Sequence, residues 1–244
     1  MGERLIVDLG SARVAWRGPG VSGVAVHTGV PGACLAEAFG SGSGPDEVIV
    51  GSVAPAVVTQ NLREWCRENW GVVPRELVAT AAAGGVRNAY AEPARLGIDR
   101  WAALVAAWKA CGGSALIADC GTAVTVDYLA EDGRHVGGLI APGLRLMREA
   151  LAHGTRLAPT SGLAPTPPLF GTDTELGVTG GTLAAVTGLL AYAAEKTAAR
   201  YGPPRALMLT GGDAPLLSER LRGGWQVRPE LVLDGLEWLV EQTP

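Results

Sequence analysis

The first apolar run of the chain is short and ends at a turn. Leu5 to Val7 are apolar, residues 8–11 read DLGS, and an alternating apolar and polar segment follows at 13–16. A short apolar run, a glycine-containing turn and an alternating run are typical of a strand, a tight turn and a second strand. The pattern therefore predicts a β-hairpin at the start of the chain.

Further strands and helices are predicted along the rest of the chain. Their expected ranges are strands at 47–50, 124–129, 135–140 and 206–209, helices at 55–69, 98–110, 144–151 and 174–200, and a closing helix near Leu236. Strands that alternate with helices in this order indicate an α/β protein with mixed sheets.

An internal repeat suggests that the chain has two similar halves. The octet LIVDLGSA at residues 5–12 recurs as LIADCGTA at residues 116–123. Both copies share Leu-Ile-x-Asp-x-Gly, a hydroxyl residue and Ala, and an alternating strand follows each. Such self-similarity indicates a duplicated domain. We therefore expect two lobes, residues 1–112 and 113–244, each opening with its own hairpin.

Composition and charge narrow the function. The chain is 48% apolar and 18% charged, enough to bury a core, and its formal charge of −4 comes with no run of Lys or Arg. This argues against binding to nucleic acid or to an anionic membrane surface. We find neither a secretion signal nor an uninterrupted apolar run of about 20 residues. The expectations are a cytoplasmic location and small-molecule partners.

The repeated turn has a possible use in phosphate binding. Its glycine permits close approach of the backbone, its N–H groups can face phosphate oxygens, and its hydroxyl can donate to them. The aspartates Asp8 and Asp119 could order a cation. One such turn alone is more often an ordinary hairpin, but two favour phosphate binding from both sides of a cleft, as in the actin-like fold. A third cluster, TGGD at 210–213, is a weak signal alone and would sit near the adenosine.

Residues 90–100 read YAEPARLGIDR and precede a predicted helix. Asp99 is either an N-cap with Arg100 solvated, or a general base for a substrate hydroxyl with Arg100 as a carboxylate clamp. Both roles are compatible in one residue. Asp127 either helps to organise a metal or ends its strand.

Several segments resemble the type III pantothenate kinases over nearly the whole chain. They are IVDLG, VGSVAP, NAYAEPARLGIDRW, ADCGTAVTVD and GGLIAPGLRLM. The resemblance implies two actin-like (ASKHA, ribonuclease H-like) domains with a nucleotide cleft between them. It also implies ATP-dependent phosphorylation of pantothenate to 4'-phosphopantothenate, the first step of coenzyme A biosynthesis, with Mg²⁺ and a monovalent cation, K⁺ or NH₄⁺. A homodimer is implied as well, and the Ala-rich helix around 101–110 is a candidate surface for it.

The resemblance assigns roles by position. Asp99 becomes the proton acceptor, and Asp119 ligates the monovalent cation. The pantothenate site comprises Tyr90, Gly97, Ile98, Asp99, Arg100 and Thr174. The nucleotide site comprises Asp8, Leu9, Gly10, Ser11, Ala12, Arg13, Val14 and Ala15, with Gly121, Thr122, Gly211 and Gly212.

The chain departs from the family in the first phosphate loop. The family usually has Asn followed by Thr or Ser there, whereas this chain has Ser11 and Ala12, and Ala15 replaces a frequent lysine. Loss of a charge-assisted contact costs about 1.5–3 kcal/mol, so we expect weakened ATP binding. Ile98 also replaces a small residue. Two alternatives remain open: a non-catalytic accessory relative of the family, supported by this loop alone, and a kinase for another small hydroxy acid.

Overall fold

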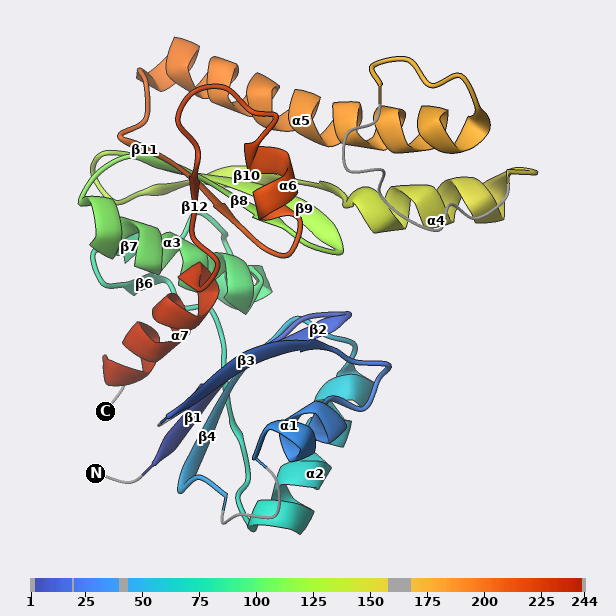
Figure 1. The fold of residues 1–244 in the computed structure, drawn as a ribbon. Coiled ribbons are helices and arrows are strands. Elements are labelled where there is room, and N and C mark those ends of the chain that lie inside the picture. Colours follow the sequence, from blue (N-terminus) through green and yellow to red (C-terminus); the bar gives the residue numbers. More distant parts are fainter. Residues whose placement is uncertain (1–2, 19, 40–43, 158–167, 243–244) are drawn as a thin grey trace. The chain divides into compact units, whose positions relative to one another are not determined.

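The computed structural model describes residues 3–18, 20–39, 44–157 and 168–242. The chain forms two compact units, one made of Met1–Ala110 with Glu230–Pro244 and the other of Cys111–Pro229. Each unit holds one five-stranded mixed sheet with helices packed on it (Figure 1). The α/β class predicted from the sequence is therefore confirmed.

The sheet of the first unit has the strand order β3-β2-β1-β4-β5. Strand β1 runs antiparallel to β2 and parallel to β4, so the predicted opening hairpin is confirmed. The strands are β1 Arg4–Leu9, β2 Arg13–Gly18, β3 Val21–Val26, β4 Glu47–Ser52 and β5 Arg75–Leu77. A separate small ribbon consists of β6 Ala82–Ala83 and β7 Val86–Arg87.

The sheet of the second unit repeats this topology. Its order is β10-β9-β8-β11-β12, with β8 antiparallel to β9 and parallel to β11. The strands are β8 Ala115–Cys120, β9 Ala123–Leu129, β10 His135–Pro142, β11 Ala206–Thr210 and β12 Gln226–Val227. The two copies of the octet thus occupy the same place in two equivalent sheets.

The helices follow the predicted order with a few additions. Those of the first unit are α1 Pro31–Phe39, α2 Ala56–Trp70, α3 Ile98–Cys111 and α7 Leu231–Glu241, with a 3₁₀ turn at Pro93–Arg95. Those of the second are α4 Leu144–Gly154, α5 Thr174–Tyr201 and α6 Ala214–Ser218. The sequence analysis missed α1, β3 and the short elements.

Alternation along the strands separates a core face from a polar face in each sheet. Leu5, Val7 and Leu9 of β1 pack in one core with residues of α1 and α2. Because successive strand side chains point to opposite faces, Asp8 lies on the other face of the sheet. The same rule places Asp119 opposite Cys120, whose side chain belongs to the core of the second unit.

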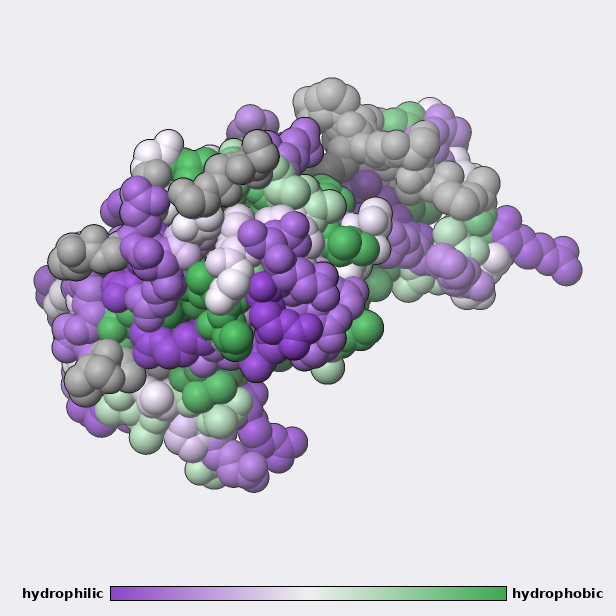
Figure 2. Space-filling view, turned by 90° about the horizontal axis from the view of Figure 1, so that it is seen from below, coloured by the Kyte–Doolittle hydropathy of each residue, from purple (hydrophilic) through white to green (hydrophobic). Residues whose placement is uncertain are grey.

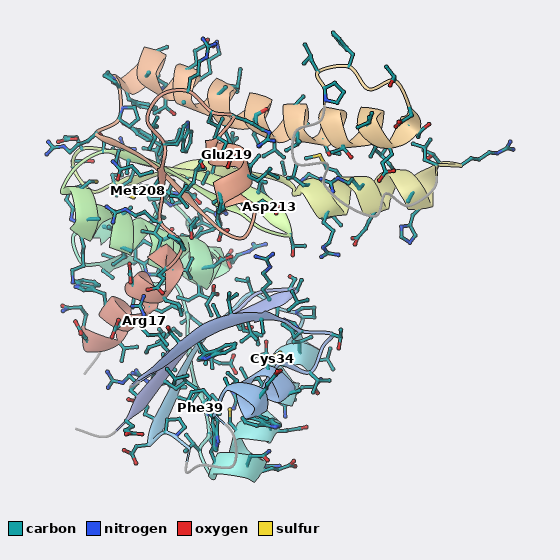
Figure 3. The ribbon with its side chains drawn as sticks, viewed as in Figure 1. Arg17, Cys34, Phe39, Met208, Asp213 and Glu219 are labelled. Carbon is teal, nitrogen blue, oxygen red and sulfur yellow. The ribbon has the colours of Figure 1, made fainter. Side chains whose placement is uncertain are left out.

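The C-terminal helix α7 packs within the first unit. A Cβ atom added at Gly235 would lie 2.0 Å from the carbonyl oxygen of Ala102, so the backbones of α7 and α3 are in close contact. Arg17 of β2 also bonds three carboxylates of the α7 segment, Glu230, Asp234 and Glu237 (Figure 3). These contacts place α7 in the first unit, so the compact units differ from the predicted halves. The division at residues 112/113 remains a prediction about duplication.

Helix α3 is almost entirely covered. Trp101, Ala102 and Leu104 have no exposed area, and Ala103 and Ala106 have little. Its apolar surface therefore forms part of the protein's interior. The suggestion that α3 offers the surface for a second copy of the chain was wrong, and its apolar composition reflects packing inside the chain.

Helix α5 is long and apolar enough to cross a membrane by length and composition alone. Such a feature is weak evidence, since core helices of water-soluble proteins pass the same test. Leu183, Val186 and Leu190 lie on one side of α5 and pack in the core of the second unit. The molecular face drawn in Figure 2 is mostly hydrophilic, with small hydrophobic areas between polar ones. Nothing here points to a membrane.

Candidate active site

The repeated turn of the second unit contacts the glycine pair that follows β11. Gly211 has a φ of +87°, and a Cβ atom there would lie 2.4 Å from Asp119 Oδ1 and 2.6 Å from the carbonyl oxygen of Cys120. Only glycine fits such a conformation and such a close approach. The Asp213 N–H also donates to the Cys120 carbonyl oxygen across 2.9 Å. The predicted third loop therefore lies beside the turn that carries Asp119.

A further glycine loop joins this cluster at the start of α4. The Gly143 N–H donates to the Thr122 carbonyl oxygen at 2.9 Å, and a Cβ at Gly143 would lie 2.1 Å from the Gly121 carbonyl oxygen. Gly143 is the N-cap of α4 and supplies no side-chain cap. The first N–H groups of a helix favour anions. Residues 119–122, 142–143 and 211–213, here called the glycine-loop cluster, thus lie together in one region of the second unit.

Two carboxylates act on the buried thiol of Cys120. Burial raises the pKa of the Cys120 thiol, and the negative charges of Asp119 and Asp213 raise this pKa further. Cys120 is therefore a neutral core thiol. Asp119 and Asp213 each carry a negative charge that acts on Cys120.

The first phosphate loop has a different shape from its copy. Leu9 pairs with Val14 across the hairpin, which leaves four residues in the turn, whereas Cys120 pairs with Val124 and leaves three. His27 braces the longer turn, since its Nε2 bonds the Gly10 carbonyl oxygen at 2.9 Å. The sequence analysis missed His27. Its only signal was a polar residue just after an alternating segment.

Side-chain burial separates two kinds of residue in this first loop. Ser11 and Arg13 are exposed, and Ala12 and Ala15 are half-buried. Leu9 and Val14 have no exposed area and belong to the core. The side chains of Leu9 and Val14 therefore cannot reach a nucleotide, while the Ser11 hydroxyl can face it directly. The Gly10 N–H and carbonyl groups are already bonded to Arg13 and His27.

The predicted pantothenate residues of the first unit lie together at the start of α3. The Asp99 Oδ1 atom accepts the Arg100 N–H at 2.7 Å, and Arg100 Nη1 donates to the Tyr90 hydroxyl at 3.0 Å. A Cβ at Gly97 would lie 2.5 Å from Asp99 Oδ1. Ile98 is buried. Four of the residues predicted around the base, Tyr90, Gly97, Asp99 and Arg100, thus form one contact group.

The structure tests one of the two alternatives drawn for this strip, the N-cap at Asp99 with a solvated Arg100. Helix α3 begins at Ile98, so Asp99 lies in its first turn and is not its N-cap. An acidic group there is still favoured by the helix dipole. Arg100 is only 6% exposed, so the reading of a solvated Arg100 was wrong. A buried guanidinium held by a phenol hydroxyl has a planar set of donors that suits a carboxylate or phosphate.

Asp127 occurs in the middle of a strand and pairs with a histidine. Its Oδ1 lies 2.9 Å from His135 Nε2, and both side chains are buried. Strand β9 continues to Leu129, so Asp127 does not end it. Among the described residues no group of three or more His, Cys, Asp or Glu is placed to hold a metal ion. The other reading of Asp127, as a metal organiser, remains a prediction.

Thr174 lies in the second unit, at the first position of α5. Asp173 caps this helix by accepting the Leu176 N–H at 2.8 Å. Thr174 itself is exposed. Its predicted role toward pantothenate remains a prediction.

Comparison with known proteins identifies the family. A protein-family model for type III pantothenate kinase matches residues 25–196. The chain belongs to this family. A type III pantothenate kinase of Halorhodospira halophila is 38% identical over 96% of both chains, and one of Nitrosococcus oceani is 34% identical over 98% of this chain and 94% of the relative.

Solved structures agree with this type III pantothenate kinase on the fold. A conserved putative Baf family transcriptional activator from Campylobacter jejuni matches 98% of both chains with a TM-score of 0.62 and 17% identity. The ethanolamine utilization protein EutJ from Carboxydothermus hydrogenoformans covers 96% of this chain and 88% of its own, with a TM-score of 0.51 and 14% identity. At such identities the likeness concerns the fold alone, and with the two equivalent sheets it confirms the actin-like prediction.

Family membership also confirms the broad functional prediction. The chain is a kinase of the pantothenate kinase type, and such a kinase uses ATP with a divalent metal.

Proposed function

We propose that the protein transfers the γ-phosphoryl group of ATP to the primary hydroxyl of pantothenate and forms 4'-phosphopantothenate, the first step of coenzyme A biosynthesis. The observation that carries this proposal is the contact group at the start of α3, where Asp99, Arg100 and Tyr90 are joined by two hydrogen bonds. It pairs a base for the hydroxyl with a cation for the carboxylate, the two polar ends of pantothenate. Membership of the type III family supports the same substrate.

Asp99 orients the acceptor hydroxyl and takes its proton. Its Oδ1 atom is fixed by the Arg100 N–H, which limits rotation of the carboxylate. A held carboxylate in hydrogen-bond reach of the hydroxyl accelerates transfer mainly by positioning, with proton removal as a second contribution. Gly97 leaves no side chain beside the Asp99 Oδ1 atom.

Arg100 binds the substrate carboxylate. A guanidinium has donors in a fixed planar fork that match the two oxygens of a carboxylate. The Tyr90 hydroxyl accepts from Nη1, and the Tyr90 ring centroid lies 5.8 Å from the Arg100 Cζ atom. These contacts hold the guanidinium in one orientation.

The glycine loops bind the nucleotide phosphates. Thr122 of the glycine-loop cluster presents a hydroxyl donor, Gly121 beside it allows the phosphates to approach the backbone, and Gly211 and Gly212 bind the adenosine side. In the first unit, Asp8 to Ala15 form the other phosphate loop. Asp8 and Asp119 fit a role toward Mg²⁺, which is usually held by phosphates and only one or two carboxylates. When bound, Mg²⁺ neutralises charge on the transferred phosphoryl group.

Asp119 also ligates a monovalent cation, K⁺ or NH₄⁺. Its carboxylate lies against the carbonyl-rich turn at Cys120 and Gly211, as the space a Cβ would fill at Gly211 indicates. Carboxylate and carbonyl oxygens are the hard ligands that such cations prefer.

The kinase acts as a homodimer in the cytoplasm. Support for a dimer comes from α5, whose exposed side carries small residues that allow a close approach of another helix; they are Gly177, Gly181, Ala184, Ala185 and Gly188. Light scattering at micromolar protein should give twice the mass of one chain, and a mass near one chain would refute this part of the proposal. We also propose that residues 1–112 and 113–244 descend from one duplicated domain, because their sheets share one strand order.

A coupled ADP-release assay tests the catalytic proposal. The purified chain is assayed with pantothenate, with other small hydroxy acids, and with a panel of nucleotides, in the presence and absence of K⁺. We expect pantothenate-dependent ADP release that requires K⁺ or NH₄⁺. No turnover with pantothenate by a folded protein would reject the function. Turnover with another hydroxy acid, and none with pantothenate, would make that hydroxy acid the substrate.

A further inference from the structure

Arg148 is a half-buried cation in the second turn of α4. Its side chain reaches α5, where Nε donates to the Thr182 hydroxyl at 3.3 Å. The Thr182 hydroxyl in turn donates to the Thr179 carbonyl oxygen at 3.1 Å. Among the described residues the Arg148 Nη2 atom has no hydrogen-bond partner, although it is shielded from solvent.

The hydrogen-bond donors of the Arg148 guanidinium are therefore only partly satisfied. The Nε and Nη2 atoms lie on one edge of the guanidinium, and that edge binds two oxygens of a carboxylate or phosphate side by side. Here one hydroxyl satisfies Nε through a long bond, and Nη2 is unsatisfied. A buried donor without an acceptor is rare in folded proteins, and one explanation is a binding role. The missing acceptor on this edge is one that an oxyanion supplies.

Arg148 lies on the helix that begins at the glycine-loop cluster, because Gly143 of the cluster is the N-cap of α4 and its N–H donates to the Thr122 carbonyl oxygen. Burial lowers the pKa of Arg148 and the Asp213 carboxylate raises it. Arginine stays charged under both effects. Asp213 belongs to the cluster, since its N–H donates to the Cys120 carbonyl oxygen. Asp213, labelled in Figure 3, immediately precedes α6.

We propose that Arg148 is a nucleotide-binding residue whose Nε and Nη2 edge contacts phosphate oxygens of ATP and ADP bound at the glycine-loop cluster. The contact requires a small turn of the guanidinium, because Nη2 is covered in the present structure. The Arg148 side chain is only partly buried, which leaves room for that turn. This inference rests on the proposed kinase function for the identity of the nucleotide.

A binding role predicts an effect on nucleotide affinity, whereas a purely structural role of Arg148 between α4 and α5 predicts an effect on stability alone.

The experiment compares Arg148→Met, Arg148→Lys and Arg145→Met with the parent protein. Arg145 is the matched control, because it lies on the same helix, is exposed and forms its ion pair with Glu149. Calorimetry measures the affinity for ATP with Mg²⁺ in the absence of pantothenate. Steady-state assays measure KM for ATP, KM for pantothenate, and the inhibition constants of ADP and adenosine.

Arg148→Met should weaken the binding of ATP and of ADP about 10- to 100-fold, as expected for a lost charge-assisted contact. The inhibition constant of adenosine and the KM for pantothenate should change less than about threefold. Arg148→Lys keeps the charge without the fork, so it should fall between Met and the parent. Arg145→Met should match the parent in every measurement, and all folded variants should have a melting temperature close to it.

Three results would overturn the inference. They are an unchanged ATP affinity in Arg148→Met, an equal loss for adenosine and ATP, and a loss that Arg145→Met reproduces. If Arg148→Met does not fold, the lysine variant decides by the same comparison of ATP with adenosine. A parent that binds ATP but does not phosphorylate pantothenate would reject the proposed function and leave the test of Arg148 readable.

Discussion

The guanidinium of Arg100 donates to the hydroxyl of Tyr90 across 3.0 Å, inside a site where Arg100 is only 6% exposed. The two residues are ten positions apart, and the 3₁₀ turn at Pro93–Arg95 lies between them. Asn88 shapes this connection, since its side chain accepts the Tyr90 N–H at 3.0 Å and donates to the Pro93 carbonyl oxygen. The cation is thus held in place by a short loop before any substrate arrives, which reduces the cost of ordering it on binding.

Removing the Tyr90 hydroxyl should weaken pantothenate binding. In Tyr90→Phe the ring remains, but Arg100 loses an acceptor that fixes its orientation. We expect a rise in KM for pantothenate of about 3- to 30-fold, because one hydrogen bond to a charged group is lost. The KM for ATP should not change. Steady-state kinetics with each substrate varied in turn checks this, and a change confined to kcat would contradict the positioning role.

Replacing the proposed base should abolish most turnover without unfolding the protein. Asp99→Asn keeps an oxygen that accepts the Arg100 N–H, so the start of α3 should be preserved. Loss of a general base lowers kcat by about 10²- to 10⁴-fold. The measurement is kcat beside a thermal melt of each protein. Near-normal turnover in the variant would leave Asp99 with a structural role only.

Activity should depend on the monovalent cation through Asp119. The parent should be active in K⁺ or NH₄⁺ and slow in Na⁺, because a smaller ion fits a potassium-sized cage poorly. Asp119→Asn should reduce the difference between these salts together with the rate. Initial rates at equal ionic strength in the three chlorides decide the matter. Equal rates in all salts, with a harmless substitution, would show that Asp119 only shapes its turn.

Restoring hydroxyl and amide groups in the first phosphate loop should improve ATP use. The double change Ser11→Asn with Ala12→Thr adds donors to an exposed turn that His27 already holds in shape. The KM for ATP should fall, by an amount equivalent to about 1–3 kcal/mol at most. Kinetics at saturating pantothenate and K⁺ measure it. If both proteins are folded yet inactive, the result favours the non-catalytic accessory protein and rejects the kinase proposal.

Gly211 should tolerate no side chain. In Gly211→Ala the added methyl carbon would meet Asp119 Oδ1 in a residue that also has a positive φ. Gly202→Ala is the matched control, because Gly202 has a φ of +84° with nothing within 4 Å of its Cβ position. Gly202→Ala should lose about 1–3 kcal/mol of unfolding free energy from its backbone conformation alone. Gly211→Ala should lose more than Gly202→Ala, because its methyl carbon also meets backbone atoms of Cys120.

Only Gly211→Ala should also weaken ATP binding, by about tenfold or more, since it displaces Asp119 and the Cys120 carbonyl group. Urea unfolding and calorimetric titration with ATP separate the two effects. Equal ATP affinity in the two variants would remove Gly211 from the nucleotide site.

The repeated octet predicted more of the fold than any other feature, and its limits are physical. It located both hairpins and their equivalence, because strand pairing follows the local alternation of side chains. It did not reveal that one turn is a residue longer than the other, since the brace on that turn comes from His27, fifteen residues after Ala12. Helix α1 was missed because it opens with Pro31 and Gly32, which are typical of a turn.

The candidate site was predictable in part for the same reason. Tyr90, Gly97, Asp99 and Arg100 are near one another in sequence, so a local motif located the contact group. Arg148 and Asp213 come from distant segments of the second unit, so no local motif could predict that the charge of Asp213 acts on Arg148. The burial of α3 was misjudged because its partner, α7, lies at the other end of the chain.

The return of α7 to the first unit has a consequence for synthesis on the ribosome. Strand β1 is made before the second unit, yet the helix that contacts it and packs its Gly235 against Ala102 is made after the second unit. The first unit must therefore remain incomplete while the whole second unit is made. The second unit, which is continuous from Cys111 to Pro229, can fold as soon as it has left the exit tunnel. The nascent chain would thus finish its middle before its beginning.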